Sequence, residues 1–171
     1  MQKTKELIVF RKLQALYPYQ FNGKNIGLSI ANGWIDDFAK LCKDIDDLLG
    51  VNKRGFHWVQ LKEKFGSARY YYEMKNRSNA STIDLIEQNE SGVLKVSTFV
   101  AEPKSKDNEK ELIEKIHNLI RKASDKTNSM CIVCSDLGSY DNQDGYTLVL
   151  CNKHKLERHA GKHLDIWPGE D

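Results

Sequence analysis

The sequence predicts an α+β fold, with N-terminal helices and a small antiparallel sheet or hairpin, followed by a C-terminal treble-clef-like zinc module. Three observations predict it. Residues 34–49 have a helical hydrophobic period, the chain becomes rich in aromatic and branched residues from Gly55, and two pairs of metal-ligating residues lie near the C-terminus. We expect an α+β core domain over residues 1–126 and a zinc-binding module over residues 127–171 that packs on it.

Two amphipathic helices are expected in the first fifty residues. Apolar residues recur every three positions from Lys5 to Leu16, and a Tyr-Pro pair then ends the helix. The second helix carries apolar residues on one face of segment 34–49 and charged residues on the other, and Gly50 ends it. Cys42 lies on the apolar face, so we interpret it as a small core residue and not as a nucleophile.

The middle of the chain alternates between extended and helical patterns. Segments 56–61 and 68–73 are rich in aromatic and branched residues, and the polar stretch between them predicts a β-hairpin. Segments 83–88 and 93–100 are candidates for two further strands. Apolar residues over 112–123 then predict a third amphipathic helix.

Two short motifs near the C-terminus have the spacing of zinc ligands. Cys131 and Cys134 form a CxxC motif, and Cys151 and His154 form a CxxH motif. A tight turn directs each pair of ligand atoms to one point, as tetrahedral zinc requires. We therefore predict that these four residues bind Zn²⁺.

The segment between the two pairs supports a treble-clef-like arrangement. Residues 137–145 are rich in turn-forming residues, 146–150 predict a strand, and 153–159 predict a helix. With four protein ligands the shell is closed, so we expect a structural metal with no open position for water or substrate. Folding of this module is then expected to depend on the metal.

Two further histidines follow the predicted ligands. His159 and His163 are four residues apart, so either one is an alternative to His154 as ligand, or a candidate for a second metal. We expect them instead to belong to a basic surface that includes Lys155 and Arg158. This surface is a candidate site for phosphate or nucleic acid, although a solvated helix face explains the same residues.

A second candidate surface lies on the predicted hairpin. Lys62, Lys64 and Arg69 are interleaved with aromatic residues that include Tyr71. Cations beside aromatic rings can hold phosphates and stack bases. Ordinary cross-strand pairs on an exposed hairpin face explain the same residues, and both interpretations stay open.

The global composition limits the other classes of function. The formal net charge is only +2, so no overall basic field indicates a nucleic-acid binder. No apolar segment approaches the roughly 20 residues that span a bilayer, and none resembles a signal-peptide core, so we expect an intracellular, cytoplasmic protein without membrane contact. Thiols in a reducing compartment favour metal binding over disulfides.

Several phrases together resemble one known family. Asn32-Gly33-Trp34 opens a helix, residues 59–71 are similar to a QVKEKFGxLRFY segment, residues 129–134 resemble SxxTCExCG, and residues 145–151 resemble GWxxTLCxxH. In this order they resemble a family of small zinc-binding proteins that is common in phages and prophages and generally uncharacterised. The sequence departs from the family at Ser135, where a glycine is usual. The resemblance implies a phage or mobile-element origin and supports the zinc assignment, but it implies no catalytic mechanism.

Three functions are compatible with these observations. The first is a non-enzymatic, phage-associated accessory protein, for example a counter-defence factor in the host-cell cytoplasm, that binds an anionic ligand (nucleotide or nucleic acid) or a host protein. The second is a metal-dependent nuclease, because treble-clef modules also occur in HNH-type nucleases, which need a histidine pair and an open metal position. The third is a protein–protein adaptor.

Overall fold

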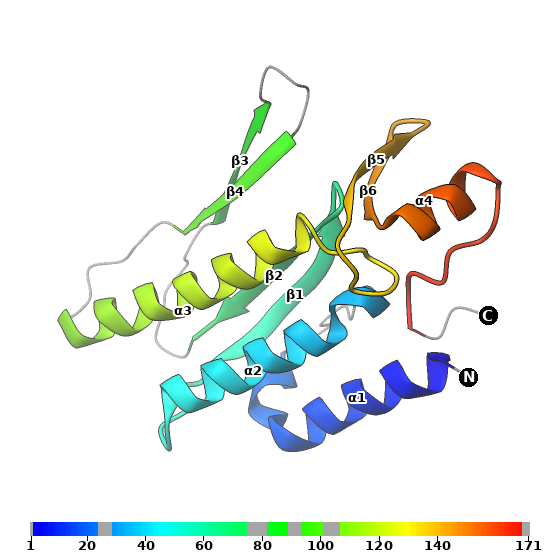
Figure 1. Ribbon diagram of the computed structural model, residues 1–171. Coiled ribbons are helices and arrows are strands. Elements are labelled where there is room, and N and C mark those ends of the chain that lie inside the picture. Colours follow the sequence, from blue (N-terminus) through cyan, green and yellow to red (C-terminus); the bar gives the residue numbers. More distant parts are fainter. Residues whose placement is uncertain (1, 24–28, 75–81, 89–93, 101–106, 169–171) are drawn as a thin grey trace.

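Figure 1 shows the computed structural model of the chain, which describes residues 2–23, 29–74, 82–88, 94–100 and 107–168. The predicted α+β class is confirmed. Its elements in chain order are α1 (Gln2–Leu16), η1 (Pro18–Phe21), η2 (Asn32–Trp34), α2 (Ile35–Leu49), β1 (His57–Lys64), β2 (Ser67–Glu73), β3 (Thr82–Gln88), β4 (Leu94–Val100), α3 (Asp107–Thr127), β5 (Ser139–Gln143), β6 (Tyr146–Leu150) and α4 (Asn152–His159).

The strands of the described segments pair into three antiparallel two-stranded hairpins, β1–β2, β3–β4 and β5–β6. The predicted hairpin over residues 56–73 is confirmed, but its turn is shorter than expected. Lys64 pairs with Ser67, so only Phe65 and Gly66 connect β1 to β2. The candidate strands 83–88 and 93–100 pair with each other as β3–β4.

The main core lies between α2 and the β1–β2 hairpin. The Phe38 ring stacks on Tyr70 with centroids 5.5 Å apart, and the same ring lies 5.5 Å from Trp58. Cys42 is fully buried on this face of α2, and burial raises the pKa of its thiol. Gln20 is also buried: its Nε2 donates to the Cys42 carbonyl at 2.8 Å, and its Oε1 accepts from Trp58 Nε1 at 3.2 Å. The predicted core role of Cys42 agrees with this packing.

Helix α3 lies beside α2 and β2 (Figure 1). Its apolar face contributes the buried residues Ile113 and Ile116, and Lys126 near its end forms an ion pair of 2.5 Å with Asp37 of α2. None of the helices in the described part of the chain combines the length and the apolar character that crossing a bilayer requires.

The C-terminal segment makes direct backbone contacts with η2, the short 3-10 helix that leads into α2. The Gly33 N–H donates to the Ile132 carbonyl at 2.9 Å, and the Asn32 N–H donates to the Ile166 carbonyl at 2.8 Å. Residues on both sides of the predicted boundary at 126/127 therefore pack together at η2, just before α2 (Figure 1). The division of the chain into two domains stays a prediction.

Candidate metal centre

The first ligand pair lies in a tight turn between α3 and β5. The Cys131 N–H donates to the Asp136 carbonyl at 2.7 Å, and the Ser135 N–H donates to the Cys131 carbonyl at 3.0 Å. Ser135 adopts a left-handed conformation with φ of 70°. A glycine, the residue that the sequence resemblance leads us to expect here, would adopt this conformation without strain.

The second pair lies where β6 meets α4. Cys151 follows the buried end of β6 and occupies the N-cap position of α4, and His154 lies in the first turn of that helix. The Lys155 N–H donates to the Cys151 carbonyl at 2.9 Å, so the first turn of α4 fixes the spacing between the two side chains. Cys151 is therefore positioned by the end of β6, and His154 is positioned by the first turn of α4.

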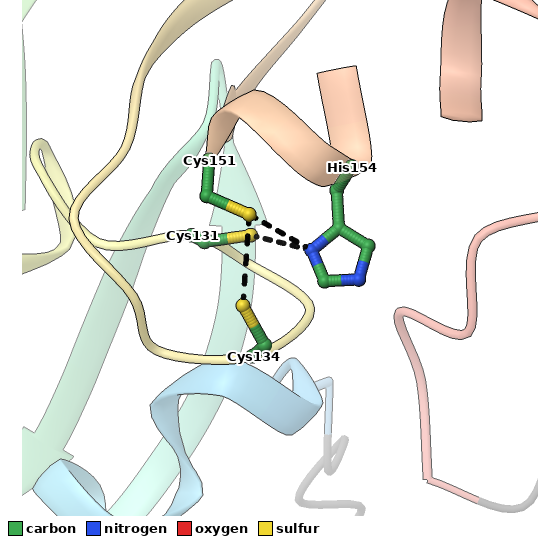
Figure 2. A group of neighbouring side chains, drawn as sticks. All are labelled: Cys131, Cys134, Cys151 and His154. Atoms are coloured by element: carbon green, nitrogen blue, oxygen red, sulfur yellow. Dashed lines mark hydrogen bonds between the residues drawn. The ribbon is translucent and has the colours of Figure 1, made fainter. Parts of the chain in front are cut away.

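The four side chains point toward one another (Figure 2), and their ligand atoms all lie within 4.8 Å of each other. His154 Nδ1 lies 3.3 Å from Cys131 Sγ and 3.2 Å from Cys151 Sγ, and Cys134 Sγ lies 3.8 Å from Cys151 Sγ. Tetrahedral zinc with its usual bond lengths separates two sulfurs by roughly 3.8 Å, and a sulfur from a nitrogen by roughly 3.6 Å. The Cys₃His cluster is therefore of a size that could hold a metal ion such as zinc.

The surroundings of the cluster act in opposite directions on two of its thiols, because burial raises the pKa of Cys134 whereas the pKa of Cys151 is lowered. Burial raises the pKa of the Cys151 thiol, but hydrogen bonds from the backbone N–H groups of His154 and Lys153 and from the neighbouring thiols outweigh it, and the pKa lies below its ordinary value. The thiolate is the form that binds metals. On the other side of the imidazole, His154 Nε2 lies 3.8 Å from Glu157 Oε2. The Nδ1 atom faces the Cys131 and Cys151 sulfurs, so it is the candidate ligand atom of His154.

The Asn32-Gly33-Trp34 phrase contacts the turn that holds the first ligand pair. A Cβ added to Gly33 would lie 2.1 Å from the Cys131 carbonyl oxygen, so only glycine permits this approach. Ser135 Oγ donates to the Gly33 carbonyl at 2.7 Å. The short helix η2, which leads into α2, therefore contacts the turn that holds Cys131 and Cys134.

Residues 62–66, which read KEKFG, contact the C-terminal segment through the turn of the β1–β2 hairpin. Glu63 Oε1 accepts a hydrogen bond from the Gly66 N–H at 2.6 Å, and Glu63 Oε2 accepts one from Tyr146 OH at 3.4 Å. A Cβ on Gly66 would approach the backbone of β6 to 3.0 Å. Burial raises the pKa of the Glu63 carboxyl, although these hydrogen bonds and nearby Arg69 oppose the rise. These residues of the motif position the hairpin against β6.

The hairpin residues that were predicted to bind an anionic ligand differ from one another in burial and in contacts. Lys62 Nζ lies 4.7 Å from the centre of the Tyr71 ring, and both side chains are half-buried. Lys64 Nζ lies 5.7 Å from the Phe65 ring. Arg69 is buried, and one of its guanidinium nitrogens donates to the Ala68 carbonyl at 2.9 Å. The structure thus brings Lys62 and Tyr71 together at the surface and places Arg69 beneath it.

The α4 residues that were predicted to bind an anionic ligand, Lys155 and Arg158, lie beside Asp141, a buried carboxylate on β5. Arg158 pairs with Asp141 at 2.9 Å and donates to the Tyr146 carbonyl at 2.6 Å, while Lys155 lies 3.9 Å from the same carboxylate. His159 Nε2 lies 3.0 Å from Asp141 Oδ1. His159 therefore faces Asp141, whereas His154 completes the Cys₃His cluster. These ion pairs hold α4 against the β5–β6 hairpin, and ligand binding by Lys155 and Arg158 stays a prediction.

Comparison of the chain with protein-family models, with curated proteins and with solved structures finds no match. The resemblance to the phage family therefore stays a prediction, and the candidate site rests on its own geometry: a Cys₃His cluster, held between the start of α2 and the β5–β6–α4 segment.

Proposed function

We propose that the chain is a non-enzymatic binding protein in which a structural Zn²⁺ ion stabilises the C-terminal segment and the β1–β2 hairpin holds an anionic ligand, a nucleotide or nucleic acid. The observation that carries the zinc assignment is the convergence of three sulfurs and one imidazole nitrogen within 4.8 Å. Four protein ligands close a tetrahedral shell, and a closed shell stabilises structure without activating water. The resemblance to a phage family supports an accessory role, such as counter-defence in the host cytoplasm, with a host protein as the alternative partner.

Native mass spectrometry of the full chain tests the zinc assignment. We expect one zinc ion per chain, and we expect Cys151→Ser and His154→Ala to lose it because each leaves only three ligands. Cys42→Ala is the matched control, since Cys42 is buried away from the cluster and its replacement should keep the zinc content. Full zinc content in Cys151→Ser would contradict the assignment.

The anion site is supported by the pairing of Lys62 with Tyr71 on the surface of the hairpin. A lysine ammonium beside a half-exposed ring offers a charge for a phosphate and a face for a base. Lys64 extends the same strand face two residues further along β1. The ligand class follows from this combination of charge and aromatic surface.

Calorimetric titration with a nucleoside triphosphate and with a short oligonucleotide tests the anion site. The double variant Lys62→Ala/Lys64→Ala should weaken binding by roughly tenfold at low salt and should reduce its salt dependence. The control is Lys40→Ala/Lys43→Ala, which removes the same charge from the exposed face of α2. If both double variants bound every tested anion with equal affinity, the result would contradict an anion site on the hairpin.

The nuclease alternative requires an open metal position. Within the described residues, the cluster that could hold a metal has four protein ligands, and His159 is paired with Asp141. Cleavage of DNA or RNA with magnesium or manganese, lost in His159→Ala, would favour this alternative. The adaptor alternative predicts partner binding that persists at high salt, because apolar contacts are not screened.

A further inference from the structure

The turn of the β1–β2 hairpin contains an aromatic residue in an unfavourable conformation. Phe65 and Gly66 have φ angles of 53° and 77°, so both lie in the left-handed region. Two-residue turns of this kind favour Asn-Gly or Asp-Gly, and the β5–β6 turn follows the rule with Asp144 (φ 54°) and Gly145 (φ 80°). A bulky aromatic residue in this region is rare and strained. Its presence at an exposed turn indicates that the ring itself has a use.

A second exposed ring lies next to this turn. Glu63 accepts one hydrogen bond from Gly66 in the β1–β2 turn and another from Tyr146 at the start of β6. The turn of β1–β2 therefore lies against β6, as Figure 1 shows, and the Tyr146 side chain reaches Glu63 from the start of that strand. Phe65 is 37% exposed and Tyr146 is 50% exposed. Tyr146 thus contacts Glu63 next to the turn that carries Phe65, so two exposed rings from distant parts of the sequence belong to neighbouring segments.

Each of these rings has a cation beside it. Lys64 Nζ lies 5.7 Å from the centre of the Phe65 ring. Arg158 Cζ lies 5.8 Å from the centre of the Tyr146 ring, but its guanidinium is held by Asp141 and the Tyr146 carbonyl, so the lysines supply the charge for a phosphate. Lys62, which lies over Tyr71, adds a further positive charge on the same hairpin. Rings that alternate with cations are the combination by which proteins bind single strands, because bases stack on the rings and phosphates lie near the cations.

Resting on the proposed anion-binding function, we propose that the ligand is a single-stranded nucleic acid whose bases stack on Phe65 and Tyr146. Bases in a duplex are already stacked and paired, so rings at the surface favour unpaired bases. Two separate rings also favour an oligonucleotide over a mononucleotide, which would use only one of them. The half-buried carboxylate of Glu63 accepts hydrogen bonds from the Gly66 N–H and Tyr146 OH and does not serve as the anion contact.

Fluorescence anisotropy with labelled oligonucleotides of about 12 residues tests this proposal on the full, zinc-loaded chain. Single-stranded DNA or RNA should bind more tightly than the duplex of the same sequence. Phe65→Gly removes the ring and also relieves the backbone strain, so it should weaken binding by roughly 5- to 150-fold while thermal stability is kept or raised. A loss of binding in this variant is therefore not a loss of folding.

Tyr146 offers a matched pair of variants. Tyr146→Ala should weaken single-strand binding to a similar degree, whereas Tyr146→Phe keeps the ring and should bind like the native chain. Single-strand affinity that is unchanged in both Phe65→Gly and Tyr146→Ala, or a duplex that binds as tightly as the single strand, would overturn the stacking proposal.

Failure of this inference can be distinguished from failure of the anion-binding proposal. If single strands do not bind but a nucleoside triphosphate binds in a manner that depends on Lys62 and Lys64, the stacking inference fails and the anion site stands. If neither ligand shows any dependence on these two lysines, both proposals fail.

Discussion

Large aromatic side chains fill the core between α2 and the β1–β2 hairpin, where Phe38 and Trp58 are fully buried. The C-terminal module has a different basis: its centre is a Cys₃His cluster, and its helix α4 is joined to β5 through the buried carboxylate of Asp141. The first region is stabilised by apolar burial, whose strength does not depend on metal or charge. The second is expected to depend on both, so changes of metal and charge should separate the two regions.

Metal removal should have the largest effect on this contrast. Structural zinc contributes on the order of 10 kcal/mol to the folding of small modules, so a strong chelator should unfold residues 130–160 while α2 keeps most of its protection. Hydrogen exchange followed by mass spectrometry measures both regions in one experiment. Equal protection of the module with and without chelator would mean that its fold does not need the metal.

Neutralising Asp141 should have the next largest effect. Asp141 is 6% exposed and the Arg158 side chain 11% exposed, so Asp141→Asn leaves a buried guanidinium without its counter-charge. We expect the free energy of unfolding to fall by about 3–5 kcal/mol, measured by urea denaturation of the zinc-loaded chain. The control Asp44→Asn removes an exposed partner of Lys40 and should cost less than about 1 kcal/mol. Similar losses in the two variants would show that the Asp141 cluster is not a special support of the module.

Gly33→Ala should affect both regions, because Gly33 lies where the N-terminal helices contact the zinc-binding segment. The added Cβ meets the carbonyl oxygen of Cys131, a backbone atom that cannot rotate away, so we expect a loss of about 1–3 kcal/mol and faster release of zinc. Gly161→Ala, where no atom lies within 4 Å, should destabilise only through its positive φ and should leave zinc release unchanged. Stopped-flow transfer of zinc to a coloured chelator measures both rates. Equal rates would show that the start of α2 does not support the centre.

Glu63→Gln should give the smallest effect, and its sign depends on pH. Burial raises the pKa of Glu63 in the folded state above its unfolded value. The folded chain therefore binds this proton more tightly, and stability falls as pH rises from the unfolded pKa through the folded pKa. Glu63→Gln removes this penalty, so its stability relative to the native chain should be higher at pH 7 than at pH 4. The opposite trend in urea denaturation would mean that the ionised carboxylate stabilises the turn.

The elements that follow a clear hydrophobic period were predictable from sequence. Helix α2, the β1–β2 hairpin and strand β6 were predicted because apolar and aromatic residues recur at helical or extended spacing. The Cys₃His cluster was predictable because Cys131 and Cys134 are close in sequence, so a local turn is enough to bring them together.

The contacts between distant segments were not predictable in this way. Asp141 lies in a polar stretch that resembles a turn, and nothing in its sequence neighbourhood indicates that three basic side chains of α4 surround it. The contact of Glu63 with Tyr146 joins residues that are 83 positions apart. Such pairs are set by how the hairpins pack, and local sequence patterns carry no record of that packing. The unusual Phe65 in the turn was visible in the sequence, but its left-handed conformation was not.

X-ray absorption at the zinc edge tests the central claim most directly. The account predicts three sulfur ligands at about 2.3 Å and one nitrogen at about 2.0 Å, with no oxygen in the shell. That result would make the metal a closed structural centre between α2 and the C-terminal segment. A shell with fewer sulfurs and an oxygen ligand would contradict the account, because it would indicate an open position at which water or substrate binds.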